Sequence, residues 1–272
     1  MQRHINEYES ANPIPMSEAK PSLTDSDHFE MPLAQLPETP EAELYTRIRD
    51  NLADILRGEI DVLSLLFTGG NKAEAYYNSA SFRTSNETAS TYIRLLVHKD
   101  QTIKILEVGA GTGGLSAAIL DKLTGNSEKC QLRCGKNTYT DISTAFFETA
   151  ANRFRAFDDV IEFKAFNLEA DLVPQGFGES MYDVVVASAV LHAASIVSTT
   201  LRNVHKLLKP NGKLVFVEPS NPTVARIGFL FGLLPGWWLS GEEDRYWSPL
   251  LSEEAWDDRL REAGFDGADV LL

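Results

Sequence analysis

Two polar residues, His192 and Glu218, follow apolar runs that are typical of buried strands. His192 comes after the run 183–188, in ASAVLHAAS, and Glu218 ends the run 213–217, in LVFVEPS. Parallel strands end at the same edge of a sheet, where α/β proteins bind ligands, so we expect both side chains at one site. A carboxylate bonded to one imidazole nitrogen makes the other nitrogen a stronger base. The pair therefore predicts a general base for a weak carbon or hydroxyl acid.

The same two positions also fit structural roles. A histidine here could cap the following helix, and the glutamate could accept hydrogen bonds from backbone amides. Position alone favours neither interpretation. The remaining histidines have the surroundings of surface or linker residues, and no catalytic role is predicted for His4, His28, His98 or His205.

A glycine-rich turn lies between a predicted strand at 103–108 and a helical apolar pattern that begins at Leu115. Gly109, Gly111 and Gly113 form G-x-G-x-G in this turn. Glycine allows a tight turn and a close approach to a ligand, and the unpaired N–H groups of a helix start face that ligand. The order of strand, glycine turn and helix predicts a nucleotide-type site.

Glu107 stands two residues before the first glycine. Dinucleotide-binding loops read G-x-G-x-x-G, and a carboxylate in the turn would repel a pyrophosphate, whereas a cationic sulfonium tolerates it. The pattern here, E-x-G-x-G-x-G, resembles the first motif of S-adenosylmethionine-dependent methyltransferases. The alternative is that Gly113 and Gly114 only begin a well-packed helix.

Four further strands are predicted at 137–141, 161–167, 183–188 and 213–217, with helices at 143–154 and 201–208 and a turn at 209–212. Alternating strands and helices predict a doubly wound, mostly parallel, Rossmann-like α/β sheet. The run 183–188 is too continuously apolar for an edge strand, so we expect it to be central.

Two of these strands end in polar residues that suit an adenosine cofactor. Asp141 ends the second strand, where an acid accepts ribose hydroxyls, although it could also cap the following helix. Asn167 ends the third strand, and Leu168, Glu169, Ala170 and Asp171 follow it in a natural position for contacts to an adenine ring.

Composition excludes several classes of function. The 272 residues, 43% of them hydrophobic, can bury one substantial core with a smaller lobe. A formal charge of −14 argues against a partner with a polyanionic surface, whether nucleic acid or anionic membrane. Without a membrane-length apolar run or a signal peptide, a cytoplasmic location is expected. Cys130 and Cys134 lack zinc or redox spacing, so we expect free thiols and no metal site.

Three segments are expected along the chain. Residues 1–40 are rich in proline and polar residues, which predicts a disordered linker. Residues 41–100 show helical patterns at 44–56, 61–67 and 87–98, which predict an N-terminal helical lobe of the kind that forms a lid, with Tyr77 among its aromatic residues. Residues 101–272 form the core with the sheet.

The segment after the fifth strand is rich in aromatic residues. Residues 229–239 read FLFGLLPGWWL, which predicts a mobile hairpin that suits a lid over an acyl chain. The following helix is expected to begin after Ser252 and to end at Gly264. Together with E-x-G-x-G-x-G, YTDIS and LHA, the motifs PGWWL and SPLLSEEAW resemble the C-methyltransferase domain of fungal-type iterative highly reducing polyketide synthases, over residues 44–272.

The resemblance implies a complete set of functional roles. His192 and Glu218 would form the catalytic dyad, and Tyr77, Trp237 and Trp238 would belong to the lid. The substrate would be a β-ketoacyl chain on the phosphopantetheine arm of an acyl carrier protein, methylated at its α-carbon among other polyketide synthase domains. S-adenosylmethionine would be the cofactor, bound by Glu107, Gly109, Gly111, Gly113, Asp141, Asn167, Leu168 and Ser188.

Two departures from the family pattern leave alternatives open. Family members commonly carry asparagine after the serine of the fourth strand, where this chain has Ala189, so one polar contact is expected to be missing. The family sheet usually has a sixth and an antiparallel seventh strand, whereas this sequence ends at 269–272, so the final strands are expected to be absent. The alternatives are a non-catalytic pseudo-methyltransferase module and a methyltransferase acting on a small-molecule oxygen or nitrogen.

Overall fold

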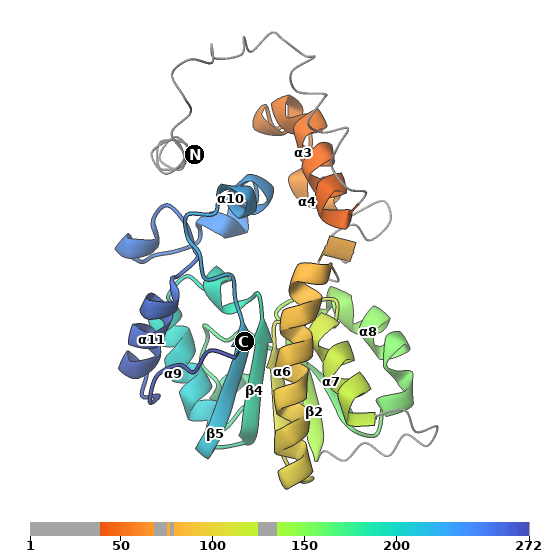
Figure 1. Cartoon of the computed structure of the whole chain (residues 1–272), viewed down its shortest axis with the longest axis vertical. Coiled ribbons are helices and arrows are strands. Elements are labelled where there is room, and N and C mark those ends of the chain that lie inside the picture. Colours follow the sequence, from red (N-terminus) through yellow and green to blue (C-terminus); the bar gives the residue numbers. More distant parts are fainter. Residues whose placement is uncertain (1–38, 68–74, 77–78, 125–134, 272) are drawn as a thin grey trace. The chain divides into compact units, whose positions relative to one another are not determined.

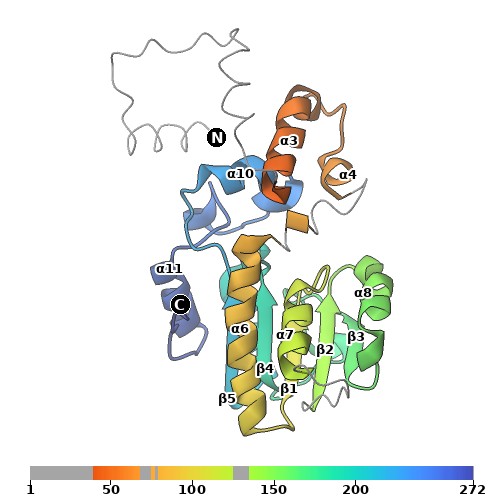
Figure 2. The ribbon, with the colours of Figure 1, turned by 45° about the vertical axis from the view of Figure 1, so that its right-hand side comes forward.

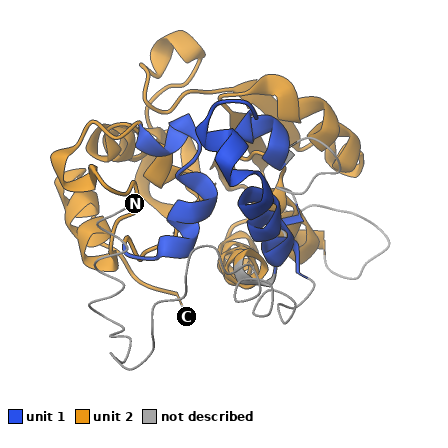
Figure 3. Cartoon of the chain, turned by 90° about the horizontal axis from the view of Figure 1, so that it is seen from above, with its two compact units in different colours: residues 1–79, 223–238 blue, residues 80–222, 239–272 orange. Residues whose placement is uncertain are grey.

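The computed structural model describes residues 39–67, 75–76, 79–124 and 135–271. The chain divides into two compact units, one formed by residues 80–222 and 239–272 and the other by residues 1–79 and 223–238 (Figure 3). The predicted boundary at residue 100 differs from this division. The helix that ends at Lys99 belongs to the unit with the sheet, because its buried face packs on strand residues, and residues 223–238 belong to the other unit.

The larger unit contains a parallel sheet of five strands in the order β3-β2-β1-β4-β5 (Figure 1). Its strands are β1 (Lys104–Val108), β2 (Lys136–Asp141), β3 (Ile161–Ala165), β4 (Tyr182–Ser188) and β5 (Leu208–Val217). The doubly wound α/β sheet is confirmed. Strand β4 is flanked on both sides, as its apolar run predicts, but β1 rather than β4 is the middle strand.

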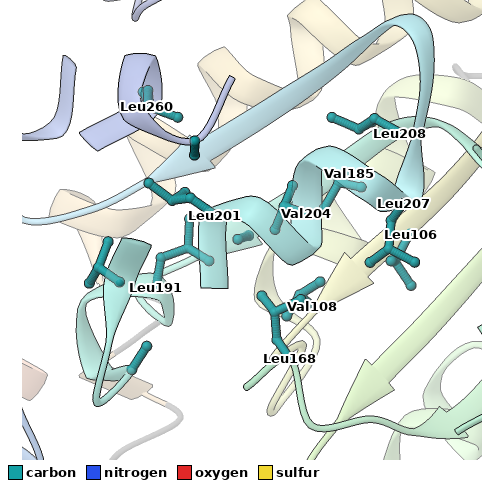
Figure 4. Packing of buried hydrophobic residues seen from close by; sticks show 14 of the residues in the cluster. Leu106, Val108, Leu168, Val185, Leu191, Leu201, Val204, Leu207, Leu208 and Leu260 are labelled. Carbon is teal, nitrogen blue, oxygen red and sulfur yellow. The ribbon is translucent and has the colours of Figure 1, made fainter. Parts of the chain in front are cut away.

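Helices cover both faces of the sheet. Figure 2 shows α6 (Ala80–Lys99) and α7 (Gly114–Thr124) side by side on one face. On the other face, α9 (Val197–Leu207) packs over β4 and β5, and α11 (Glu253–Glu262) packs against α9, with Trp256 on Phe216 of β5. Figure 4 shows Leu201 and Val204 of α9 in this core, where full burial of a leucine contributes about 2 kcal/mol.

Local sequence signals set several element ends. Ser252 caps α11 by accepting a hydrogen bond from the amide of Ala255 at 3.2 Å, and Gly264 follows the helix with a φ of +101°. The prediction for Ser252 is confirmed, whereas the C-cap is Ala263, one residue before the predicted Gly264. The turn at 209–212 lies inside the bounds of β5, because Tyr182 pairs with Leu208 and the next pair joins Val184 to Lys213. The predicted helix at 143–154 is a 3-10 turn followed by α8 (Phe147–Arg153).

The smaller unit is helical. It contains α3 (Pro40–Leu56), α4 (Val62–Phe67), α10 (Ala225–Phe231) and a 3-10 helix at Pro235–Trp238. The predicted hairpin at 229–239 is therefore wrong. In α10, Leu230 is buried and the two aromatic rings beside it stack on other rings of this unit. The ring centroids of Phe229 and Tyr45 are 6.0 Å apart, and those of Phe231 and Trp237 are 6.3 Å apart.

Some predictions fall outside the described residues, namely the linker up to residue 38, Tyr77, Cys130 and Cys134. Residues 265–271 form no strand, so the described part of the chain shows five strands in this sheet and none of the further strands of the family pattern. Among the residues that the structure describes, no helix has both the length and the apolar character needed to cross a lipid bilayer.

Candidate active site

The carboxyl ends of β4 and β5 bring His192 and Glu218 together. Ser188 and Val217 are paired at the ends of these strands, so the two residues that follow reach the same edge of the sheet. Nδ1 of His192 lies 2.5 Å from Oε2 of Glu218. The predicted pair is therefore formed, from residues 26 positions apart.

Glu218 is also bound to the backbone. Its Oε1 accepts hydrogen bonds from the amides of Val190 at 2.9 Å and Leu191 at 2.6 Å. These amides begin the 3-10 turn Leu191–Ala193, here called the His192 turn. The Glu218 side chain is only 2% exposed, so both oxygens need such partners. Glu218 thus makes the backbone contacts of the structural interpretation and also the contact with His192 that a dyad requires, while the catalytic role stays a prediction.

The chain leaves β4 through an unusual backbone conformation at Ala189. This residue has a φ of +54°, and its amide donates to the carbonyl of Val217 at 2.7 Å. A left-handed conformation costs an alanine roughly 1–2 kcal/mol, whereas asparagine and glycine adopt it more readily. The backbone therefore explains why asparagine suits this position.

The three glycines of the loop all have positive φ, with values of +61° at Gly109, +53° at Gly111 and +78° at Gly113. A Cβ on Gly109 would overlap Cγ2 of Val190, just before the His192 turn. A Cβ on Gly111 would meet nothing closer than 3.9 Å, so there the backbone conformation alone requires glycine.

Asp141 ties the glycine loop to the end of β2. Its Oδ2 accepts a hydrogen bond from the amide of Gly111 at 2.9 Å, and its Oδ1 accepts one from the amide of Ser143 at 2.8 Å. The hydroxyl of Tyr139 donates to the carbonyl of Gly111 at 2.7 Å. Since a carboxylate has about four acceptor positions, Asp141 keeps capacity for ligand hydroxyls.

Glu107 belongs to β1, and its side chain is buried against α7. It is 2% exposed, and the hydroxyl of Ser116 donates to its Oε2. Burial raises the pKa of Glu107 to about 7, although the bond from Ser116 acts in the opposite direction. The contact with Ser116 gives this residue a role in packing the loop, and its contact with a cofactor stays a prediction.

The other predicted cofactor residues have mixed surroundings. Leu168 is buried in the same hydrophobic cluster as Leu191 and Val108, and it lies beside Val108 (Figure 4). The backbone of Asn167 is held by the Gln175 side chain, with N–O distances of 2.8 and 2.9 Å. Ser188 donates to Oδ1 of Asn86 at 3.0 Å. Direct contacts of these residues with a cofactor stay predictions.

Sequence reasoning missed two residues around this edge of the sheet. Asn86 is buried beside Ser188, and Arg245 binds the carbonyl of His192 at 2.8 Å. Glu169, expected near an adenine ring, accepts a hydrogen bond from the amide of Ser195 at 2.7 Å. Glu242 and Arg245 are three residues apart in GEEDR, and this spacing predicts an ion pair between them. It does not predict that Arg245 binds the carbonyl of His192. Trp237 and Trp238, predicted for the lid, lie in the smaller unit.

Comparisons with known proteins agree with the geometry. A family model described as "Methyltransferase domain" matches residues 106–214. The chain is 42% identical over 230 residues to squalestatin tetraketide synthase of Phoma sp. (strain C2932), which covers 85% of this chain and 9% of that protein. The chain thus spans about a tenth of the length of this curated relative.

Two solved structures are similar over most of the chain. One is the trans-methyltransferase CalH in complex with SAH, with a TM-score of 0.79, 34% identity and coverage of 90% of this chain and 68% of CalH. The other is the DszA carbon methyltransferase, with a TM-score of 0.80, 31% identity and coverage of 89% and 64%. The chain belongs to the methyltransferase family, and within it to the carbon methyltransferase domains of polyketide synthases.

Proposed function

We propose that this chain methylates the α-carbon of a β-ketoacyl thioester held on an acyl carrier protein, with S-adenosylmethionine as the methyl donor. The observation that carries the proposal is the contact between His192 Nδ1 and Glu218 Oε2 at the edge of the sheet beside the glycine loop. We also propose that the chain acts in the cytoplasm as part of a polyketide synthase, beside the other domains of the synthase.

The glycine loop fits an adenosine cofactor. Gly111 has no side chain, and a Cβ there would meet nothing closer than 3.9 Å, so its backbone is open to a ligand; Asp141 accepts a hydrogen bond from the amide of the same residue. Acceptor positions on the Asp141 carboxylate suit ribose hydroxyls. S-adenosylmethionine would supply an electrophilic methyl group on a sulfonium, and Gly109, Gly111, Gly113 and Asp141 would hold its nucleoside end.

His192 would act as the general base. With a proton on Nδ1 facing the Glu218 carboxylate, the lone pair is on Nε2, which accepts the α-proton of the substrate. Glu218 stays bonded to two backbone amides and to the ring throughout, so the ring keeps one orientation. The α-carbon, as the enolate, would then bond to the methyl group in line as the methyl–sulfur bond breaks and the neutral thioether leaves. The residues of this chain would contribute alignment and a site with little water.

The substitution His192→Gln tests this role. Purified chain is incubated with S-adenosylmethionine and a β-ketoacyl pantetheine thioester, and mass spectrometry follows the addition of one methyl group at the α-carbon. We expect transfer to fall about 100-fold or more, with little change in cofactor affinity. His98→Gln, on the exposed end of α6, is the matched control and should behave like the wild type.

The outcome separates the candidate functions. Methylation of oxygen or nitrogen in a small molecule, with none of the thioester, would favour the second enzyme class. Cofactor binding without any transfer would favour a non-catalytic module. Equal activity of His192→Gln and wild type would exclude His192 as the base.

A further inference from the structure

The His192 turn has backbone groups at both ends that are not satisfied within the turn. At its beginning, Glu218 accepts hydrogen bonds from the amides of Val190 and Leu191. At its end, the carbonyls of His192, Ala194 and Ser195 accept hydrogen bonds from a single side chain, that of Arg245, at 2.8, 2.7 and 3.3 Å. An anion thus holds the amides at the start of the turn, and a cation holds the carbonyl of His192 together with the carbonyls of the two residues that follow the turn.

Every N–H group of the Arg245 guanidinium has an acceptor. Besides the carbonyls of His192, Ala194 and Ser195, Nη1 donates to the carbonyl of Pro249 at 3.0 Å, and Nε donates to Oε2 of Glu242 at 2.8 Å. The side chain is 0% exposed. A buried guanidinium is destabilising unless all of its five donors are satisfied, and here they are. Packing alone would be served better by an apolar side chain, so the charge points to a specific task.

The partners of Arg245 are themselves anchored. Oε1 of Glu242 pairs with Nη1 of Arg259 in α11 at 2.5 Å, and its Oε2 accepts a hydrogen bond from the amide of Val197, the first residue of α9, at 3.2 Å. The guanidinium therefore has a fixed position relative to two helices of the same unit. Any movement of the His192 turn would break several of its hydrogen bonds.

We propose that Arg245 is a positioning residue for His192. By holding the carbonyl of His192 itself and those of Ala194 and Ser195, which follow the turn, it keeps the imidazole within hydrogen-bonding distance of Glu218. A displacement of about 1 Å in a catalytic group can cost about 100-fold in rate, so this restraint matters for transfer. The inference rests on the proposed role of His192, but the alignment of His192 can be measured without turnover.

The substitution Arg245→Lys tests the proposal. Lysine keeps the charge but offers three donors from one atom and cannot match the fork of carbonyls. We expect kcat to fall about tenfold or more, with KM for the thioester and the Kd of S-adenosylmethionine within about twofold of wild type. The downfield proton resonance of His192 Nδ1–H, assigned by its loss in His192→Gln, should shift or broaden.

Arg261→Lys is the matched control. Arg261 lies in α11 and is exposed, and its side chain pairs with Asp257 at 2.8 Å. Both kcat and the His192 resonance should stay at wild-type values in this variant. If Arg261→Lys loses as much activity as Arg245→Lys, the loss is a general effect of replacing an arginine in this region. Such a result would overturn a specific role for Arg245.

Other outcomes are equally decisive. If Arg245→Lys keeps the wild-type resonance, the positioning role is overturned, whatever happens to kcat. If Arg245→Lys does not fold, Glu242→Gln takes its place, because this variant keeps an oxygen for Arg245 Nε but removes the charge. It should shift the His192 resonance and lower kcat by less than the tenfold expected for Arg245→Lys. No change in either the resonance or kcat would overturn the proposal. If the wild type transfers no methyl group, the proposed function fails, while the resonance still tests Arg245.

Discussion

Nδ1 of His192 lies 2.5 Å from Oε2 of Glu218, while Oε1 of the same carboxylate holds the amides of Val190 and Leu191. One buried carboxylate therefore positions both the ring and the backbone turn that carries it. The two oxygens have separate roles, and substitutions can address them separately.

The substitution Glu218→Gln should separate these roles. The amide oxygen of the new side chain can still accept from the amides of Val190 and Leu191, but its NH₂ group would face Nδ1 of His192 and favour the tautomer with no lone pair on Nε2. We expect methyl transfer to fall about 100-fold or more. The Kd of S-adenosylmethionine should change little, and steady-state kinetics with calorimetry would measure both.

Glu162→Gln is the control for this variant, because Glu162 lies in β3 and pairs with Lys136 at 2.8 Å, away from the dyad. It should leave kcat unchanged. Retention of near-wild-type kcat in Glu218→Gln would show that the carboxylate only holds the turn.

The buried Glu107 predicts a dependence of stability on pH. Burial raises its pKa from 4.5 to about 7, so the folded state binds the proton more tightly than the unfolded state does. Its contribution is fully present below the unfolded pKa and is lost as the pH rises toward about 7. Over this window the free energy of unfolding should fall by about 3 kcal/mol from this residue.

Urea unfolding of the wild type and of Glu107→Gln, from about pH 4 to about pH 8, measures this contribution as the difference between the two curves. The glutamine variant should gain stability relative to wild type as the pH rises. Glu162→Gln should show the opposite sign, because the bond with Lys136 lowers the pKa of Glu162 and its contribution is lost as the pH falls. If the difference in the free energy of unfolding between wild type and Glu107→Gln does not change with pH, the raised pKa of Glu107 is contradicted.

The left-handed backbone of Ala189 predicts a stabilising substitution. Ala189→Gly should raise the free energy of unfolding by roughly 0.5–1 kcal/mol, because glycine adopts a φ of +54° without steric strain, offset in part by its greater flexibility when unfolded. Thermal and urea unfolding would measure the change. Ala187→Gly, two residues earlier in the regular part of β4 and fully buried, should instead destabilise. Equal effects at the two positions would contradict this explanation.

The contact between Gly109 and Val190 predicts coupling between two substitutions. Gly109→Ala would bring a methyl group into overlap with Cγ2 of Val190, so it should destabilise more than Gly111→Ala, which is strained only by its φ. Val190→Ala removes the Cγ atoms and should recover part of the loss, with a coupling of about 1 kcal/mol in a double-mutant cycle. Additive effects in urea unfolding would mean that the loop moves away from Val190.

The sequence by itself determined the local elements and their order. An apolar run that ends in glycine predicts β1, and a continuous apolar run predicts β4. The serine and glycine at its ends predict α11, and the alternation of strands and helices predicts the doubly wound sheet. These features depend on neighbours along the chain, so patterns of period two or 3.6 reveal them. The same local patterns were ambiguous at 229–239, where a helix stands in place of the predicted hairpin.

Only the tertiary structure decided which polar groups meet. Strand register pairs His192 with Glu218 across 26 positions, and the packing of the loop before α11 brings Arg245 to the carbonyl of His192 across 53 positions. Burial between β1 and α7 gives Glu107 its raised pKa. Such contacts join residues that are distant in sequence, and their distances and solvation depend on how whole elements pack, which residue spacing does not encode.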